Sequence, residues 1–363
     1  MPAHNRNPKL IVDLSKLRSN IEKVRIMCQD AGIEMAGVIK GFRGLPQGAK
    51  QFEQAGCKFI ASSRLDQLEP LREFGIQTPL MMIRVPMLTE AYDVVRIADI
   101  SLNSDVQVLK ELNKQAGAQD KKHKVILMAD LGDLREGFWD KADMVEAAVM
   151  VENELHNLEL AGVGTNLGCY GSIAPTRDKM EELISIAERI EERIGRELEY
   201  ISGGATSGLT TLMDGEMPSR INLLRIGEGV ILARDLQDIW GYDMSYLHKD
   251  VFTLRAEVIE VRDKPTHPVG KIMIDCFGRR PIYEDRGIRK RALLGIGRVD
   301  YGTPEDLMPI NKKIKVVGAS SDHTIIDVED AEDIHVGDVV DFRLCYANLV
   351  YVTGSRNVSV VFI

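Results

Sequence analysis

Met35-Ala36-Gly37-Val38-Ile39-Lys40-Gly41 is an apolar run that ends in a lysine followed by a glycine. A run this short and apolar predicts a buried β-strand, with Lys40 where the strand turns into a loop. Burial there lowers the pKa of the amine, and a neutral amine can attack a carbonyl to form a Schiff base. The alternative interpretation is an ordinary lysine at a strand end, whose ammonium group reaches solvent. The rest of the chain decides between the two.

Seven more runs of this kind follow, and amphipathic helical patterns separate them. The eight predicted strands cover residues 34–40, 58–62, 79–84, 99–103, 124–131, 158–167, 199–205 and 222–232. The helical patterns include residues 47–55, 66–74 and 180–194, each closed by a glycine, and an extra helix at residues 14–28. This alternation favours a closed parallel (β/α)8 barrel, a TIM barrel. A doubly wound open sheet is the alternative, but no Gly-x-Gly-x-x-Gly turn follows an early strand.

The pattern changes near residue 246. Beyond it, β-branched runs alternate with Gly, Pro, Asn and Asp, and few helical patterns remain. These runs cover residues 251–261, 271–275, 291–296, 314–317, 324–328, 338–344 and 357–362. We therefore expect two domains: residues 1–246 form the barrel, with an extra N-terminal strand and helix, and residues 247–363 form a C-terminal all-β domain.

Composition limits the classes of function. The chain has 363 residues, 44% of them hydrophobic, which is enough for two cores. Its net charge of −9 argues against binding nucleic acid or an anionic membrane. The five cysteines are odd in number and contain no Cys-x-x-Cys pair, which indicates free thiols in a reducing compartment. With no signal-peptide core and no membrane-length apolar run, we expect a cytoplasmic protein.

Polar and small residues gather where the predicted strands end, which is where barrel enzymes carry their chemistry. The fifth to eighth strands contribute Arg135, Asn166, Ser202, Gly204, Thr206, Arg225, Gly227 and Glu228. The last two of these loops are rich in small residues with free backbone N–H groups, and barrels often hold phosphate there. A lysine on the first strand opposite a phosphate site suits pyridoxal phosphate, whose aldehyde and phosphate both project from one ring.

The chain resembles the alanine racemase-type pyridoxal-phosphate enzymes, and within them the subgroup described as ornithine racemases. The resemblance runs over nearly the whole chain, as a barrel followed by a β-domain. Its sharpest stretches are Gly37-Val38-Ile39-Lys40, Leu131-Gly132-Asp133-Leu134-Arg135-Glu136-Gly137, Gly164-Thr165-Asn166-Leu167, Cys169-Tyr170-Gly171 and Gly318-Ala319-Ser320-Ser321-Asp322-His323.

The resemblance implies roles for individual residues. Lys40 would hold the cofactor and act as one proton-transfer base, and Arg225 would face the pyridine nitrogen. Asn166 falls where alanine racemases place a histidine against the ring, and Arg135 where an arginine contacts a cofactor oxygen or the substrate carboxylate. The other cofactor contacts implied are Ser202, Gly204, Thr206, Gly227 and Glu228.

The arginine on the eighth strand also carries a mechanistic argument. A guanidinium group beside the pyridine nitrogen keeps that nitrogen unprotonated, because a second positive charge there is costly. The ring is then a weaker electron sink, which suits proton transfer at Cα and disfavours side reactions. Decarboxylases with the same two-domain plan are expected to have an acidic residue at the position of Arg225.

Two positions depart from the alanine racemase pattern. The tyrosine that serves as the second base is replaced by Phe277, which cannot transfer a proton. The candidate substitutes are Cys276, Tyr283, Ser321 and Tyr346, and we favour Tyr346, for which a half-buried strand tyrosine is the alternative interpretation. Met128 replaces a lysine that is carbamylated to orient the arginine, so Arg135 must be positioned differently.

Substrate choice is expected to depend on the β-domain. Asp322 aligns with an acidic residue that, in the related ornithine decarboxylases, reaches the distal amine of the substrate across the dimer. A carboxylate there would select a diamino acid through a charge-assisted hydrogen bond. The alternative is an aspartate that caps a turn. His323 lies beside it, but no second ligand follows at short spacing, so we predict no metal site.

The sequence thus predicts a homodimeric pyridoxal 5'-phosphate racemase with shared active sites, acting on a basic amino acid, ornithine first and lysine next. The alternatives are an alanine or broad-specificity racemase and, on the same scaffold, a basic amino-acid decarboxylase. From another class, a noncatalytic cofactor-carrier protein remains open, although such carriers resemble the barrel alone.

Overall fold

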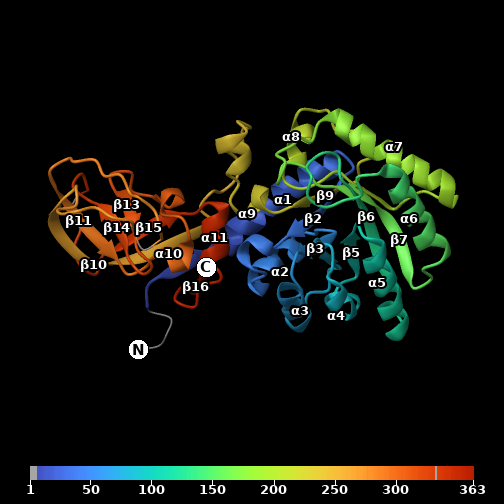
Figure 1. The fold of residues 1–363 in the computed structure, drawn as a ribbon, viewed down its shortest axis with the longest axis horizontal. Helices are drawn as coiled ribbons and strands as arrows, with labels where there is room; N and C mark the ends of the chain where they lie inside the picture. The colour runs from blue at the N-terminus through green and yellow to red at the C-terminus, as the bar shows by residue number, and fades with distance from the viewer. Residues whose placement is uncertain (1–5, 276, 332) are drawn as a thin grey trace. The chain divides into compact units, whose positions relative to one another are not determined.

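The protein is described by a computed structural model that covers residues 6–275, 277–331 and 333–363 (Figure 1). Contacts within the chain divide it into two compact units. The first unit is Leu17–His248, and the second joins the described residues up to Lys16 to Lys249–Ile363. The domain boundary expected at residue 246 stays a prediction.

The first unit is a closed barrel of eight parallel strands, as the sequence predicted. Its strands are β2 (Glu34–Val38), β3 (Phe59–Ser62), β4 (Leu80–Met82), β5 (Ile100–Asn103), β6 (His123–Ala129), β7 (Leu158–Thr165), β8 (Tyr200–Ser202) and β9 (Leu223–Ile226). Each strand pairs in parallel with the next, and β9 pairs with β2 to close the barrel. The doubly wound open sheet is thereby ruled out.

Helices connect the strands of this unit, and the longer ones cover the outside of the barrel (Figure 1). They are α1 (Leu14–Asp30), η2 (Lys40–Phe42), α2 (Pro46–Gln54), α3 (Leu65–Glu73), η3 (Leu88–Glu90), α4 (Ala91–Ile97), α5 (Val106–Ala118), α6 (Lys141–Asn153), α7 (Arg177–Ile194), α8 (Gly208–Met213), α9 (Glu228–Ile231) and η4 (Asp235–Ile239). The predicted strand at residues 222–232 is wrong beyond Ile226, because the backbone turns at Gly227 and starts α9. Lys40 likewise begins η2 instead of ending β2.

Alternate residues of the strands fill the barrel interior with one apolar cluster. Its members come from all eight strands: Ala36, Val38, Phe59, Ala61, Met81, Ile100, Leu102, Ile126, Met128, Ala161, Tyr200 and Leu223. The residues between them face the surrounding helices. Gly37 is one of these, and a side chain there would lie 2.1 Å from the Phe52 ring of α2, so the glycine lets this helix pack against β2.

The second unit is built on an antiparallel sheet in the order β12-β15-β10-β11-β14-β13. The strands are β10 (Phe252–Pro265), β11 (Ile288–Leu294), β12 (Met308–Pro309), β13 (Lys315–Ala319), β14 (Thr324–Asp327) and β15 (Val339–Arg343). The N-terminal strand β1 (Lys9–Val12) joins this unit, since it pairs antiparallel with β10 and parallel with β16 (Ser359–Phe362).

Some features of the second unit differ from the sequence prediction. Residues 271–275 form no strand. The helical turns α10 (Arg298–Tyr301), η5 (Pro304–Asp306) and α11 (Tyr346–Val352) were not predicted. Within the described ranges, no helix of either unit is long and apolar enough to cross a lipid bilayer.

Candidate active site

Lys40 lies at the carboxyl end of the barrel strands, directly after β2. Ala36 and Val38 point into the barrel, and after Val38 the backbone turns through Ile39 into η2, whose first residue is Lys40. Burial lowers the pKa of its amine below the usual value for lysine. An amine with a lowered pKa is a better nucleophile and proton acceptor near neutral pH than a solvated lysine.

Polar and charged groups from three other strand ends act electrostatically on Lys40. Cys169 and Glu136 raise the pKa of its amine, and Arg135 and Arg225 lower it. Arg135 and Glu136 follow β6, Cys169 follows β7, and Arg225 lies within β9. The structure therefore brings Lys40, Arg135 and Arg225 near one another, with Glu136 and Cys169 beside them, and the roles of these residues stay predictions.

Arg225 is buried in β9 with 3% of its surface exposed. It occupies the interior position two residues after Leu223. Its guanidinium group donates to the Ser202 hydroxyl in β8 and, at 2.8 Å, to the Thr165 carbonyl at the end of β7. Burial lowers the pKa of Arg225 to about 10, so the group remains a cation at neutral pH. These bonds hold a positive charge at a fixed point in the barrel mouth.

Asn166 follows Thr165 directly and carries an unsatisfied donor. Its Nδ2 atom is buried and has no hydrogen-bond partner. An unpaired buried amide costs free energy, so a native protein that retains one has a reason to do so. A bound group with an acceptor atom beside Asn166 would satisfy this donor.

The loops after β8 and β9 are tied together at Thr206. Its hydroxyl oxygen accepts the backbone N–H groups of Gly227 and Gly229, each at 3.3 Å. Gly204, with a φ of 112°, lies in the same loop as Thr206. Small residues with backbone N–H groups at two neighbouring strand ends are of the kind that accept an anion, although the Thr206 hydroxyl already accepts the N–H groups of Gly227 and Gly229.

Glu228 was predicted to contact the cofactor, but its carboxylate is already engaged. One oxygen accepts the backbone N–H groups of Arg234 and Asp235, at 3.0 and 3.2 Å, and the other is buried without a partner. The side chain therefore supports the turn after α9. Only the backbone N–H of Glu228 remains as its contribution to an anion site.

Glu228 makes the stability of the barrel depend on pH. Burial, with a further contribution from Asp235, raises the pKa of its carboxyl from 4.5 to about 7. The folded state therefore binds a proton more tightly than the unfolded chain, so the stabilisation is complete below pH 4.5 and is lost as the pH rises through 7. This group should lower the free energy of unfolding by up to about 3 kcal/mol between pH 4.5 and pH 8.

We expect Glu228→Gln, which keeps one acceptor oxygen, to remove that decline. Urea denaturation of both proteins from pH 5 to pH 8 would measure it. The variant should gain stability relative to the wild type as the pH rises, and a difference that stays constant with pH would contradict this account.

Arg135 is held by its neighbour in the sequence. Two of its guanidinium nitrogens donate to the two carboxylate oxygens of Glu136, whose side chain is largely buried. Met128, which replaces the carbamylated lysine of alanine racemases, lies buried in the barrel core. Glu136 thus supplies an anion for Arg135 from a different position. The Arg-Glu pair is part of a motif noted in the sequence, but the sequence alone indicated no role for Glu136.

Glu136→Gln should weaken the site without unfolding it. The amide keeps one acceptor for Arg135 but loses the charge, and charge-assisted bidentate bonds are about twice as strong as neutral ones. We expect kcat/KM for the reaction proposed below to fall about tenfold. Glu181→Gln, which removes the same kind of partner from Arg177 on the surface of α7, is the matched control. Equal kcat/KM values in the two variants would exclude the role of Glu136.

Tyr346 and Asp322 are the two site residues predicted in the second unit. Tyr346 is the first residue of α11 and is half-buried, so it does not occupy the strand position considered in the alternative interpretation. Asp322 is exposed in the turn between β13 and β14 and accepts a hydrogen bond from the Ser321 hydroxyl at 2.6 Å. The roles of Tyr346 and Asp322 stay predictions.

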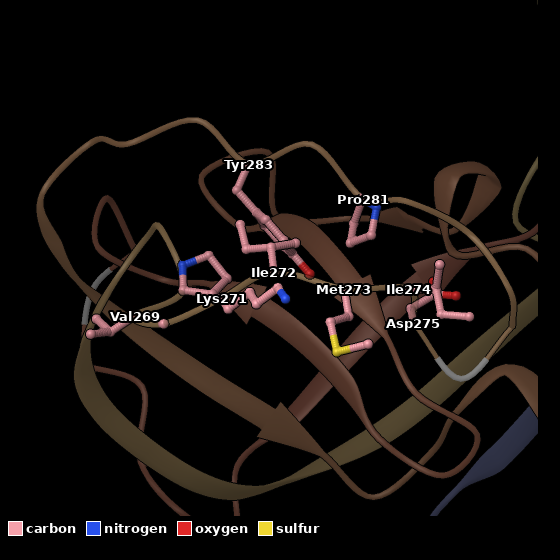
Figure 2. A pocket seen from close by; sticks show the side chains of 10 residues that line it. Val269, Lys271, Ile272, Met273, Ile274, Asp275, Pro281 and Tyr283 are labelled. Carbon is pink, nitrogen blue, oxygen red and sulfur yellow. The ribbon is translucent and has the colours of Figure 1, made fainter.

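Of the other residues considered for the second base, Ser321 lies beside Asp322 in the turn between β13 and β14, and Tyr283 lies between β10 and β11. The ring of Phe277 lies 4.5 Å from the Arg298 guanidinium carbon, a cation–π contact. Tyr283 lines a shallow hollow of about 210 Å³ formed by residues 268–275, Pro281 and Tyr283 itself (Figure 2). Cys276 lies outside the described residues. In the part of the chain that the structure describes, no group of three or more His, Cys, Asp or Glu side chains is arranged to hold a metal ion.

The chain combines a closed barrel, with a lysine and an arginine at its mouth, and a β-unit that follows it. Comparison with known proteins finds enzymes of the same architecture. The family model described as alanine racemase, N-terminal domain, matches residues 12–235. The chain therefore belongs to the alanine racemase family, which confirms the resemblance found in the sequence.

Two curated relatives are similar over almost their whole length. The ornithine racemase of Acetoanaerobium sticklandii is 40% identical and covers 94% of this chain and 96% of its own. The lysine racemase of Thermotoga maritima is 39% identical and covers 98% of both chains. Among solved structures, alanine racemase from a D-cycloserine-producing Streptomyces lavendulae superposes with a TM-score of 0.78 at 19% identity, over 99% of this chain and 98% of that one.

Proposed function

We propose that this protein is a pyridoxal-phosphate-dependent racemase that interconverts the L- and D-forms of a basic amino acid, with ornithine the first candidate and lysine the second. The observation that carries the proposal is the placement of Lys40 and Arg225 together at the barrel mouth, with the amine pKa lowered. The substrate class is supported by the similarity to an ornithine racemase and a lysine racemase.

The barrel residues fit the cofactor. The Lys40 amine would hold its aldehyde carbon, and Arg225 would face its pyridine nitrogen. Its phosphate would be surrounded by Ser202, Gly204, Thr206, Gly227 and the backbone of Glu228. The unpaired Nδ2 of Asn166 would donate a hydrogen bond to the cofactor. When bound, the cofactor withdraws electrons from the substrate Cα and so makes its proton acidic. A similar fold, alanine racemase from Bartonella henselae, is described with covalently bound pyridoxal phosphate (TM-score 0.73, 16% identity).

Racemisation needs a proton acceptor on one face of Cα and a donor on the other. Lys40 would serve one face, since burial lowers the pKa of its amine and so makes the neutral form more accessible. Tyr346 of the partner subunit is our candidate for the opposite face, and Arg135, held by Glu136, would bind the substrate carboxylate. Asp322 would bind the distal ammonium group of the substrate.

An exposed apolar loop supports the proposed homodimer. Val269, Met273 and Ile282 are 93%, 68% and 98% exposed in the single chain, close to the hollow of Figure 2. Figure 2 shows Tyr283 and Ile272 among the side chains that line this hollow. A soluble protein rarely exposes so many large apolar side chains together unless a partner covers them. We propose that a second copy of the chain covers this loop and shares the active sites.

The proposal is tested by incubating the purified protein with single L-amino acids and separating the enantiomers by chiral chromatography. We expect D-ornithine, and more slowly D-lysine, with little D-alanine. Release of carbon dioxide with a diamine product would identify a decarboxylase. Absence of any product from the whole panel would favour the noncatalytic carrier.

A further inference from the structure

Asp133 lies in the loop after β6 with 1% of its surface exposed. A second loop, formed by residues 168–173 after β7, surrounds the Asp133 carboxylate and is named the 168–173 loop. Four backbone N–H groups of this loop point at the carboxylate. Oδ1 accepts those of Gly168, Cys169 and Ile173 at 3.2–3.3 Å, and Oδ2 accepts that of Tyr170 at 3.0 Å.

Two further contacts hold the loop in place. The Ser207 hydroxyl donates to the carbonyl of Leu167, just before the loop, at 2.7 Å. Gly171 lies so close to Asp133 that a side chain on it would come within 2.7 Å of the Asp133 carbonyl oxygen. Cys169 and Tyr170 are exposed, and Ile173 packs against the apolar core at the end of the loop, so between Gly168 and Tyr170 the loop is held mainly by its N–H groups on the Asp133 carboxylate.

The 168–173 loop borders the candidate active site. Cys169 interacts electrostatically with Lys40, Arg135 and Arg225. Asn166, with its unpaired amide, precedes the loop by two residues. Asp133 itself stands two residues before Arg135. One buried carboxylate thus connects the loop that carries the proposed substrate-carboxylate arginine to the loop that borders the lysine.

We propose that Asp133 is a positioning residue for substrate binding, which fixes the 168–173 loop against the loop that carries Arg135. This inference rests on the proposed function. Lys40 and Arg225 are held by the barrel itself, so loss of the Asp133 bonds leaves them in place and disorders the substrate side of the site. The effect falls on KM more than on kcat.

The test compares Asp133→Asn with the wild-type holoenzyme. Asparagine offers one acceptor oxygen, and its NH₂ group faces backbone N–H donors. Amide hydrogen exchange followed by mass spectrometry should show exchange of the 168–173 peptide at least about tenfold faster, with the barrel strands unchanged. The KM for the preferred L-amino acid should rise about tenfold, with kcat within about threefold of the wild-type value.

Gly171→Ala is the second variant, because it displaces the loop while the carboxylate remains, and it should reproduce both effects even if Asp133→Asn does not fold. Asp105→Asn is the matched control: its carboxylate accepts two N–H groups at the start of α5, and its loss should change neither measurement. Exchange that stays slow, or faster exchange with unchanged KM, would overturn the positioning role. A wild-type protein that forms no D-amino acid would instead refute the proposed function, and with it this role, while the exchange measurement would still report on the loop.

Discussion

Lys40→Ala is expected to abolish racemisation, with kcat reduced at least about 10⁴-fold. The variant loses the amine that would hold the cofactor and the base that would move the Cα proton. Because these two functions belong to one group, no neighbouring side chain can replace it. Arg135 and Arg225 carry guanidinium groups that remain cations at neutral pH, so neither can accept the Cα proton in place of Lys40.

The measurement is the rate of D-product formation, together with the visible absorbance of the purified protein. The variant should be colourless after gel filtration, whereas the wild type should retain an absorbance band from bound pyridoxal phosphate. Lys110→Ala, which removes a lysine from the surface of α5, should keep both activity and colour. Activity of Lys40→Ala above about 1% of the wild-type value would exclude Lys40 as the base.

Arg225→Ala should have the second-largest effect, a fall in kcat on the order of 10²-fold. The substitution removes a fixed cation from the barrel mouth and leaves the Ser202 hydroxyl and the Thr165 carbonyl without their buried donor. Both losses act on the electrostatics of the site. Arg225→Lys keeps the charge but cannot donate to Ser202 and Thr165 with the fixed geometry of a guanidinium group, so we expect an intermediate kcat.

Circular dichroism and thermal unfolding of the same variants would separate lost catalysis from lost structure. Arg220→Ala, which breaks a surface ion pair with Glu191, should leave kcat unchanged. If Arg225→Ala folds and its kcat matches the wild-type value, the cation has no role in the reaction. Carbon dioxide release by Arg225→Glu would support the argument that an acidic residue there favours decarboxylation.

The barrel and its two main charges could be predicted because they depend on local regularities. Eight apolar runs alternate with helical patterns, and Lys40 and Arg225 fall in the first and the eighth of these runs. The resemblance to a known family then assigned Lys40 and Arg225 to one site, although they are 185 positions apart in the sequence. No spacing rule connects strands so distant in the sequence.

What could not be predicted depends on partners chosen in three dimensions. Glu228 stands beside the anion-binding glycines in the sequence, yet its carboxylate turns to the backbone of residues 234 and 235. The sequence showed Asp133 only as one residue of a motif. Its four hydrogen bonds are to backbone N–H groups, which every residue except proline has, so the sequence does not reveal them. The strand β1 reads like any short apolar run, and only its pairing with β10 and β16 shows which unit it joins.

The most direct test is to treat the purified protein with sodium borohydride, digest it and determine by mass spectrometry which peptide carries a reduced pyridoxyl phosphate group. We predict one modified residue per chain, Lys40, and loss of racemase activity in step with its modification. An unmodified Lys40 in a protein that still converts L-ornithine to D-ornithine would contradict the account.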